Sequence, residues 1–419
     1  MISKQYVLDF INSHDYDVRK SHNARWIDQK CTPDVVMIVA DCVLHYSYEK
    51  NEPFTRADIW RCQYAEENVH DIFRKPSVHD KNAESEYDKF FSQPLKLLAY
   101  AGVLNEQKGT PDGKQIKTNF YTIADIEVLK FIAARELNSL YFVTEYISKV
   151  LSDSGLTPDF EAFFDEQTPE AMDALRHSFF SFTQKNTPVN GNFECGRIFT
   201  KIINPLAFSR NLRGTERGAI SKQAIGYADL MYNRNNFRDL LVNKPKGVTR
   251  QEYAQQLPDM SNDGYIKLMS IKSKQYLKEY NDLFRDSITE HNDDIEVNGL
   301  GVHVHHIFPE AVFPEISAYL ENLIVLTPTQ HLTHAHPMGK TRVIDPAYQH
   351  QLILSKINRI RENLSDNDPG LLNMCEPGYD FNNLLYVLST GLEDESINDI
   401  ASGDYDSLIA AVNAHYQAA

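Results

Sequence analysis

The chain has 419 residues, 42% of them hydrophobic and 24% charged, which is typical of a globular protein with room for several domains. Taken alone, its formal net charge of −16 argues against a nucleic-acid-binding protein, because DNA is a polyanion. The five cysteines are scattered, no apolar run is long enough for a membrane span, and the first residues lack a signal-peptide pattern, so we expect a cytoplasmic protein with free thiols and no membrane partner.

Residues 1–155 are predicted to form a helical domain. Helical apolar spacing or a capped start predicts its helices, at residues 4–11, 35–46, from Thr55 onward, 85–100 and 125–151. Two short strands, at 103–104 and 120–123, are expected around a polar loop that carries lysines. This order of helices and hairpin resembles a winged helix, a DNA-binding fold. The alternative is a helical packing domain with an ordinary hairpin.

Residues 156–290 are predicted to form a middle region whose composition changes along its length. The first part is acidic and rich in phenylalanine, and acidic neighbours would repel phosphate, so we expect these rings in a core rather than stacked on bases: Phe160, Phe163, Phe164, Phe179, Phe180 and Phe182. From Arg197 to Arg250 the chain instead has eleven basic and three acidic residues, a formal charge of +8. A helical stretch over 256–288 then leads into the next region.

The basic segment, residues 197–250, is a candidate DNA-contacting surface. Asparagines and tyrosines accompany its arginines and lysines, and all four types contact phosphates and base edges in protein–DNA complexes. We expect five arginines to lie at phosphates or guanine edges, namely Arg210, Arg213, Arg217, Arg234 and Arg238. The alternative is an ordinary solvated basic face.

The stretch 302–336 holds six of the fifteen histidines. An Asn-Gly turn signal before an alternating apolar run predicts a strand that ends at His305 and His306. Residues 323–326 have the composition of a second strand. Residues 327–335 begin with the Thr-Pro pair typical of an N-cap and first helical position, and predict a short helix. We therefore expect histidines from the first strand and from this helix to converge on one metal ion.

This order of strand, loop, strand and helix resembles the HNH nucleases, which use the ββα-metal fold. The matching residues are His305 and His306, then Asn322 in a Glu-Asn-Leu sequence, and His331 nine positions later. The resemblance implies that His305 and His331 bind a divalent metal ion and that His306 is the catalytic general base. It also implies that Asn322 holds the loop in place.

The third metal ligand stays open between two histidines. Many HNH nucleases have a further ligand four residues after the helix ligand, but that position is Ala335 here, flanked by His334 and His336. Mg²⁺ is the expected metal, with Mn²⁺ or another transition metal as alternatives, since imidazole binds those ions better than it binds Mg²⁺. Beyond the histidines, Lys340 and Arg342 lie in a short basic turn that either contacts a flanking phosphate or is a plain loop.

These patterns predict a mainly α protein with small β elements, an α+β fold. Its expected parts are a winged-helix-like domain (1–155), the middle region (156–290), the HNH ββα-metal module (291–345) and a helical C-terminal region (346–419).

The HNH resemblance implies a site-specific, divalent-metal-dependent double-strand DNA endonuclease of restriction type. The expected partners are double-stranded DNA, a second copy in a homodimer, and a cognate DNA methyltransferase in the same system. Homing and phage-defence nucleases, some dependent on DNA modification, share this module. The other hypothesis is a non-catalytic winged-helix regulator with a structural metal site, but a regulator has no need of a general base such as His306 beside a ligand.

Overall fold

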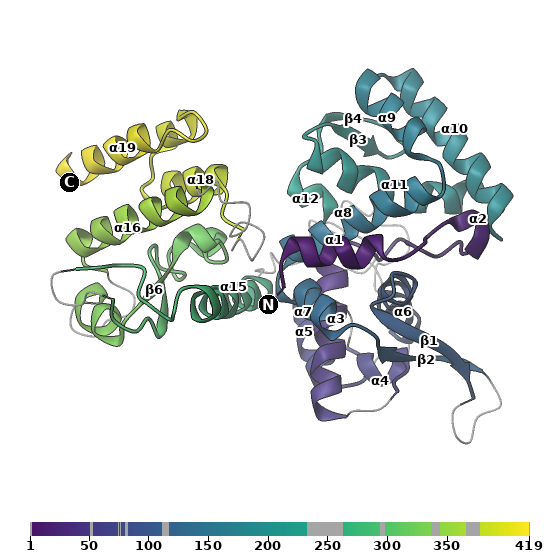
Figure 1. The fold of residues 1–419 in the computed structure, drawn as a ribbon, viewed down its shortest axis with the longest axis horizontal. Helices are drawn as coiled ribbons and strands as arrows, with labels where there is room; N and C mark the ends of the chain where they lie inside the picture. Colours follow the sequence, from purple (N-terminus) through teal and green to yellow (C-terminus); the bar gives the residue numbers. More distant parts are fainter. Residues whose placement is uncertain are drawn as a thin grey trace, which may run out of the picture. The chain divides into compact units, whose positions relative to one another are not determined.

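The computed structural model describes residues 2–50, 53–73, 75, 77–79, 83–110, 117–232, 263–293, 298–336, 344–365 and 378–418. The chain divides into two compact units, residues 5–261 and residues 262–419 with 1–4 (Figure 1). Most described residues are helical, and the described strands form three small antiparallel pairs, so the mainly α class with small β elements is confirmed. The boundary falls inside the predicted middle region, so that range contributes to both units. Among the described helices, none combines the length and apolar character needed to cross a membrane.

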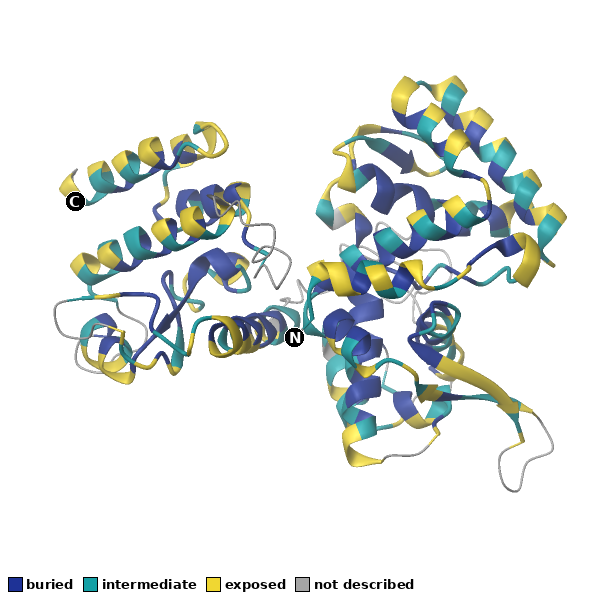
Figure 2. Cartoon of the chain, in the orientation of Figure 1, coloured by how far each residue is buried: buried dark blue, intermediate teal, exposed yellow. Residues whose placement is uncertain are grey.

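The N-terminal unit is built around a buried helix, α3 (Pro33–Glu49). This helix is apolar on nearly all sides and is buried along most of its length (Figure 2), as expected for a helix in a core. The other described helices are α1 (Lys4–Asn12), α2 (Val18–Ser21), α4 (Arg56–Trp60), α5 (Gln63–Phe73), α6 (Glu84–Tyr100), α7 (Ile126–Ala134), α8 (Glu136–Asp153), α9 (Thr157–Glu166), α10 (Pro169–Asn186), α11 (Asn192–Ser209) and α12 (Tyr227–Leu230). Helices α6, α7 and α8 all pack against α3.

Two hairpins complete this unit, β1 (Leu104–Gly109) with β2 (Thr118–Ile123), and β3 (Arg213–Glu216) with β4 (Ala219–Ala224). The first hairpin is longer than the sequence predicted. Phe54 pairs with Tyr121 of β2, which adds a third extended segment beside it. Thr55 begins α4 as predicted, with a capping box in which its side chain and that of Asp58 each bond the other's backbone N–H.

The single helix predicted over 125–151 is wrong. The structure has two helices there, because Arg135 is extended, with φ −154° and ψ 152°, and separates α7 from α8. No glycine or proline marks this break in the sequence. Both helices pack on α3, so we attribute the break to tertiary packing.

The phenylalanine-rich part of the middle region lies on helices α9 and α10. As predicted, most of these rings are in a core, where they contact one another and Phe199 of α11. Four are buried and two are partly exposed, respectively Phe160, Phe163, Phe164 and Phe179, and Phe180 and Phe182.

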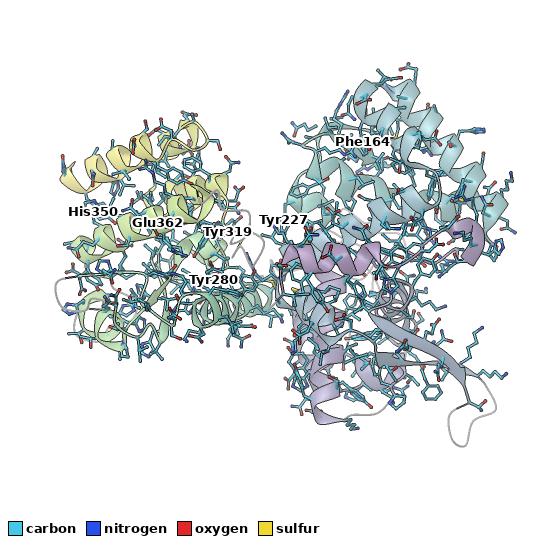
Figure 3. All side chains as sticks on the ribbon, in the orientation of Figure 1. Phe164, Tyr227, Tyr280, Tyr319, His350 and Glu362 are labelled. Atoms are coloured by element: carbon cyan, nitrogen blue, oxygen red, sulfur yellow. The ribbon has the colours of Figure 1, made fainter. Side chains whose placement is uncertain are left out.

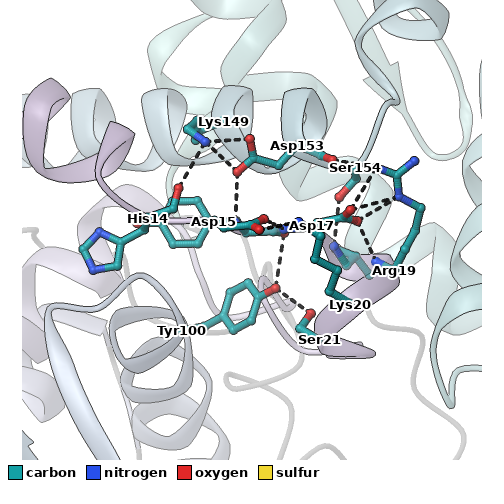
Figure 4. Close-up of polar contacts among 12 residues, drawn as sticks. His14, Asp15, Asp17, Arg19, Lys20, Ser21, Tyr100, Lys149, Asp153 and Ser154 are labelled. Carbon is teal, nitrogen blue, oxygen red and sulfur yellow. Dashed lines mark hydrogen bonds and ion pairs between the residues drawn. The ribbon is translucent and has the colours of Figure 1, made fainter.

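A polar network fastens the segment before α2 to the end of α8 (Figure 4). The Asp153 carboxylate accepts a 2.9 Å hydrogen bond from the Tyr16 backbone and pairs with the Lys149 ammonium at 2.6 Å. The Ser154 hydroxyl accepts the backbone N–H of Val18 at 3.1 Å. These bonds satisfy backbone groups that the adjacent core would otherwise leave unpaired.

The C-terminal unit packs helices around a two-stranded hairpin. Its described elements are α15 (Asp263–Phe284), β5 (His303–His306), β6 (Leu323–Leu326), a π-helix (Gln330–Ala335), α16 (Pro346–Ser365), α18 (Phe381–Gly391), α19 (Tyr405–Ala418) and the 3-10 turns η1 (Pro314–Ile316), η2 (Leu320–Asn322) and η5 (Glu395–Asp399). Strand β6 is buried at all four positions.

A buried ion pair links α16 to the hairpin. The Lys356 ammonium lies 3.3 Å from the Glu290 carboxylate and donates a 2.6 Å hydrogen bond to the Tyr379 hydroxyl. The same carboxylate accepts the backbone N–H of Val325 in β6 at 2.8 Å. Burial outweighs this pairing for the lysine and lowers the pKa of Lys356 to about 8, whereas Lys356 and Arg285 hold the pKa of Glu290 below its ordinary value. The pair therefore holds β6, the strand that pairs with the histidine-bearing strand β5.

Candidate metal centre

The histidine-rich stretch forms the predicted hairpin. Strands β5 and β6 are antiparallel, with His305 opposite Ile324 and His306 opposite Leu323. Successive side chains of a strand point to opposite faces, so His303 and His305 share one face and His306 lies on the other. Both strands lie where the sequence predicted them.

Asn322 holds the loop that joins the two strands. It is fully buried, its amide oxygen accepts the backbone N–H of Phe308 at 2.8 Å, and its amide nitrogen donates to the carbonyls of Phe308 (3.1 Å) and Ile316 (3.2 Å). One side chain thus joins the start of the loop to its far end. An aspartate could not make the same contacts, because it lacks the donor.

Three histidines, one from β5 and two from the segment after β6, converge beside the hairpin. The imidazoles of His305, His331 and His336 have ring centroids 4.9–5.0 Å apart, and one nitrogen from each lies within 4.8 Å of the other two. Ligand nitrogens around a tetrahedral zinc ion are about 3.4 Å apart, at about 2.1 Å from the metal. The three nitrogens are thus near enough to hold a metal ion, provided that the rings move closer together on binding.

His336, rather than His334, is the third member of the triad. It follows the π-helix directly in an extended conformation, and its ring centroid lies 4.9 Å from that of His305 and 5.0 Å from that of His331. His334 instead lies against the Tyr348 ring, with centroids 5.6 Å apart. The sequence predicted a short helix here but not its π character, and it left this ligand open.

The nitrogens of the triad suit a metal ion. The Nε2 atom of His305 is buried and has no hydrogen-bond partner among the described residues, although buried polar atoms normally have one. The Nδ1 atom of His331 lies 3.0 Å from that of His303, which leaves Nε2 of His331 for a metal. Sequence reasoning had not given His303 this supporting position.

Electrostatics keep two members of the triad, His305 and His331, in the form that binds metals. Burial, then the neighbouring histidines, hold the pKa of His305 well below its ordinary value, and the same two causes lower the pKa of His331 to about 4. Imidazole must be neutral to act as a ligand, so both side chains are ready to bind at neutral pH. The nearby Lys274 ammonium acts in the same direction on both rings.

On the opposite face of β5, His306 is held by backbone and side-chain contacts. Its Nε2 atom lies 3.0 Å from the carbonyl oxygen of Ser317 and 3.3 Å from the Ser270 hydroxyl. Because a carbonyl only accepts, Nε2 carries the hydrogen, and Nδ1 is left with its lone pair, 3.8 Å from the Glu310 carboxylate. Burial lowers the pKa of His306 to about 4, so Nδ1 is free to take a proton at neutral pH.

Helix α15 contributes residues that the sequence had not singled out for the site. Ser270 and Lys274 are one helical turn apart, and Ser270 donates a 3.1 Å hydrogen bond to Glu310. Burial lowers the pKa of Lys274, which also acts electrostatically on three of the histidines. The i, i+4 spacing was visible in the sequence, but nothing local indicated that this helix reaches the hairpin.

The arginines expected to contact DNA are in part engaged within the N-terminal unit. Arg210 makes two 2.6 Å hydrogen bonds to Glu161 and stacks on the ring of Phe164, which Figure 3 labels, at 4.4 Å. Arg213 donates to the backbone carbonyl of Gln167. These contacts occupy guanidinium N–H donors that a bound phosphate would need.

Arg217 differs from these two. It is exposed at the two-residue turn between β3 and β4, where Arg217 and Gly218 both have positive φ, and it has no ion-pair partner among the described residues. The other predicted DNA contacts, Arg234, Arg238, Lys340 and Arg342, lie outside the residues that the structure describes.

Comparison with protein-family models, curated proteins and solved structures found no match to this chain.

Proposed function

We propose that the chain is a divalent-metal-dependent double-strand DNA endonuclease of the HNH type. One observation carries the proposal: His305, His331 and His336 converge on one face of a hairpin, and His306 on the other face keeps an unprotonated Nδ1. A plain structural metal site uses the triad but gives no reason for an adjacent histidine with a fixed tautomer and a free nitrogen.

The chemistry follows from the groups at hand. A divalent ion held by the triad would act as a Lewis acid on the scissile phosphate and stabilise the 3′ oxygen as its bond to phosphorus breaks. His306 Nδ1 takes the proton of the attacking water, whose oxygen forms the new bond to phosphorus. The Lys274 ammonium neutralises charge on the phosphate. The products are a 5′-phosphate and a 3′-hydroxyl, which takes its proton from solvent.

The finer domain assignments belong to the same proposal. The order of α3, the Phe54 segment, α4 to α6 and the β1–β2 hairpin supports a winged-helix-like domain. Helix α6 begins with acidic residues, two of which pair with arginines of the same unit, so we do not assign base recognition to it. DNA contact is assigned instead to the basic segment, residues 197–250, and the double-strand cut to a homodimer whose two-fold axis matches that of the DNA.

A second function is favoured by the burial of the triad. His305 and His336 are only 3% and 5% exposed, as in a structural metal site that supports a non-catalytic DNA-binding regulator. The two functions differ in what they require of His306. Only the nuclease needs its free Nδ1.

The test is cleavage by the purified full-length chain. Supercoiled plasmid and linear DNA, with and without base methylation, are incubated with Mg²⁺, with Mn²⁺ or with excess chelator, and the ends are mapped by sequencing. We expect metal-dependent double-strand breaks with 5′-phosphate ends, at one sequence for a restriction-type enzyme. Binding of DNA without cleavage under every metal and methylation condition would favour the regulator.

A further inference from the structure

The N-terminal unit contains a pocket far from the histidines in sequence, with a volume of about 600 Å³. Its walls come from α10, the first half of α11, the β3–β4 turn, the loop before α3 and the residues after α12. The volume lies within the range of about 300–1,000 Å³ typical of small-molecule sites.

The pocket is strongly basic although the chain is acidic. Four cationic side chains line it, Arg176, Arg197, Lys201 and Arg217, and no acidic side chain is among the described residues of its lining. Arg176 and Arg197 make ion pairs of 3.7 Å and 3.3 Å with residues on their own helices, contacts that are weak at a partly exposed surface. Four cations from three elements thus face one space that lacks a countercharge in its lining.

Two of these cations lack a partner of their own. The side chains of Lys201 and Arg217 make no hydrogen bond or ion pair within the part of the chain that the structure describes. Lys201 is partly buried, and burial lowers its pKa against the opposing field of Asp34. A desolvated cation without a partner is costly, and an anionic ligand in the pocket would remove that cost.

Other lining groups suit a planar base. The Phe193 ring is 68% exposed, and the guanidinium of Arg197 lies over it, 4.1 Å from the ring centroid. The side-chain amide of Gln29 has no hydrogen-bond partner among the described residues, and Asn192 and Tyr232 add further polar atoms. Aromatic faces stack on nucleobases, and amides bond their edges. Helix α11 also begins at this pocket without a side-chain cap, which favours an anion at its N-terminus.

We propose that this pocket binds a nucleotide, with Lys201, Arg217 and Arg176 at its phosphate and Phe193 against its base. The ligand is either a free nucleotide or one nucleotide of a DNA strand, since both present the same chemistry. The proposal does not rest on the metal centre, whose residues lie in the other unit.

The test measures binding to the full-length chain, with no cleavage step. ATP, adenosine and inorganic phosphate are titrated by calorimetry in chelator, and a labelled single-stranded oligonucleotide is followed by fluorescence polarisation. We expect Arg217→Ala and Lys201→Gln each to weaken nucleotide binding about tenfold or more, because each removes a charge-assisted hydrogen bond. The matched control is Lys222→Ala on the same hairpin, an exposed cation outside the pocket, which should change affinity less than about twofold.

The outcomes separate the two sources of the ligand. If ATP binds and the pocket variants weaken its binding, the ligand is a free nucleotide. If only the oligonucleotide binds in this way, the ligand is a nucleotide of a DNA strand. The proposal is overturned if neither probe binds, if adenosine binds as tightly as ATP, or if Lys222→Ala weakens binding as much as Arg217→Ala. Thermal unfolding of each variant checks that Lys201→Gln keeps the fold.

Discussion

The adjacent histidines His305 and His306 of β5 have different surroundings, because successive side chains of a strand point to opposite faces. His305 faces two other imidazoles, and its buried Nε2 has no hydrogen-bond partner among the residues described. His306 faces a carbonyl that fixes its tautomer, and a serine and a carboxylate that lie near its ring. A ligand and a base can therefore occupy neighbouring positions without competing for one metal ion.

Replacing His306 by alanine should abolish most cleavage but leave metal binding intact. A positioned general base contributes about 10²- to 10⁴-fold to a rate, and His306 is not a member of the triad. Single-turnover cleavage kinetics with Mg²⁺ or Mn²⁺ give the rate, and calorimetry gives the metal affinity. His334→Ala, which removes a histidine near Tyr348, is the control. Full cleavage activity in the His306 variant would exclude it as the base.

Replacing a member of the triad should instead weaken metal binding itself. We expect His305→Ala, His331→Ala and His336→Ala each to reduce the affinity for Mn²⁺ or Zn²⁺ by at least about tenfold, since even groups that only support a ligand contribute 10- to 100-fold. His334→Ala on the same short helix should leave affinity within about twofold. If the His334 variant loses metal and the His336 variant keeps it, the assignment of the third ligand is wrong.

At the scale of elements, local sequence patterns predicted the two strands, whereas long-range packing determines the π-helix and the approach of α15 to the hairpin. Alternating or continuous apolar residues gave β5 and β6 at their observed positions, because that signal is local. The π-helix depends on more than its own residues, since the carbonyl of Ala335 is bonded by the backbone N–H of Asp345, beyond the histidines. The approach of α15 to His306 likewise joins residues 36 apart, so the sequence could not place Ser270 in the site.

The loop between β5 and β6 should depend on Asn322 for both stability and function. Asn322→Ala leaves the backbone N–H and carbonyl of buried Phe308 without their partner, and each unsatisfied buried group costs about 1–3 kcal/mol. We expect a loss of about 3 kcal/mol in the free energy of unfolding, measured with urea, and weaker cleavage from a displaced loop. Asn382→Ala, an exposed position on α18, is the control and should change stability by less than about 0.5 kcal/mol.

The buried Lys356–Glu290 pair, which joins α16 to β6, should also contribute to stability. Replacing one partner of a buried pair leaves an uncompensated charge, and such changes cost about 3–5 kcal/mol. We expect Lys356→Met to destabilise the chain by this amount, because the Glu290 carboxylate is only 2% exposed. The double variant Lys356→Met with Glu290→Gln should recover part of that loss. Equal stability of the single and double variants in urea would contradict a coupled pair.

At the scale of the whole molecule, charge is unevenly distributed along the chain. The net charge of −16 coexists with a +8 segment and with a pocket lined by four cations. The acidic part of the chain repels DNA and so disfavours non-specific association. Attraction to DNA is then confined to the basic surfaces. Stability should also be sensitive to acid, because burial lowers the pKa values of His305, His306 and His331.

Acidification should destabilise the metal-free chain from about pH 6.5 downward, before most carboxylates titrate. Burial lowers the pKa of His306 from 6.5 to about 4, so between these values the unfolded chain binds more protons than the folded chain. Stability is therefore fully present above pH 6.5 and falls as the pH drops toward 4, by about 3 kcal/mol for His306 alone at 1.36 kcal/mol per pH unit. Urea unfolding in chelator at pH 7.5, 6.5, 5.5 and 4.5 measures the slope. His306→Gln, which cannot titrate, should flatten it, whereas His79→Gln, at an 83% exposed side chain, should not. Parallel slopes for wild type and His306→Gln would show that this histidine is not held neutral by the fold.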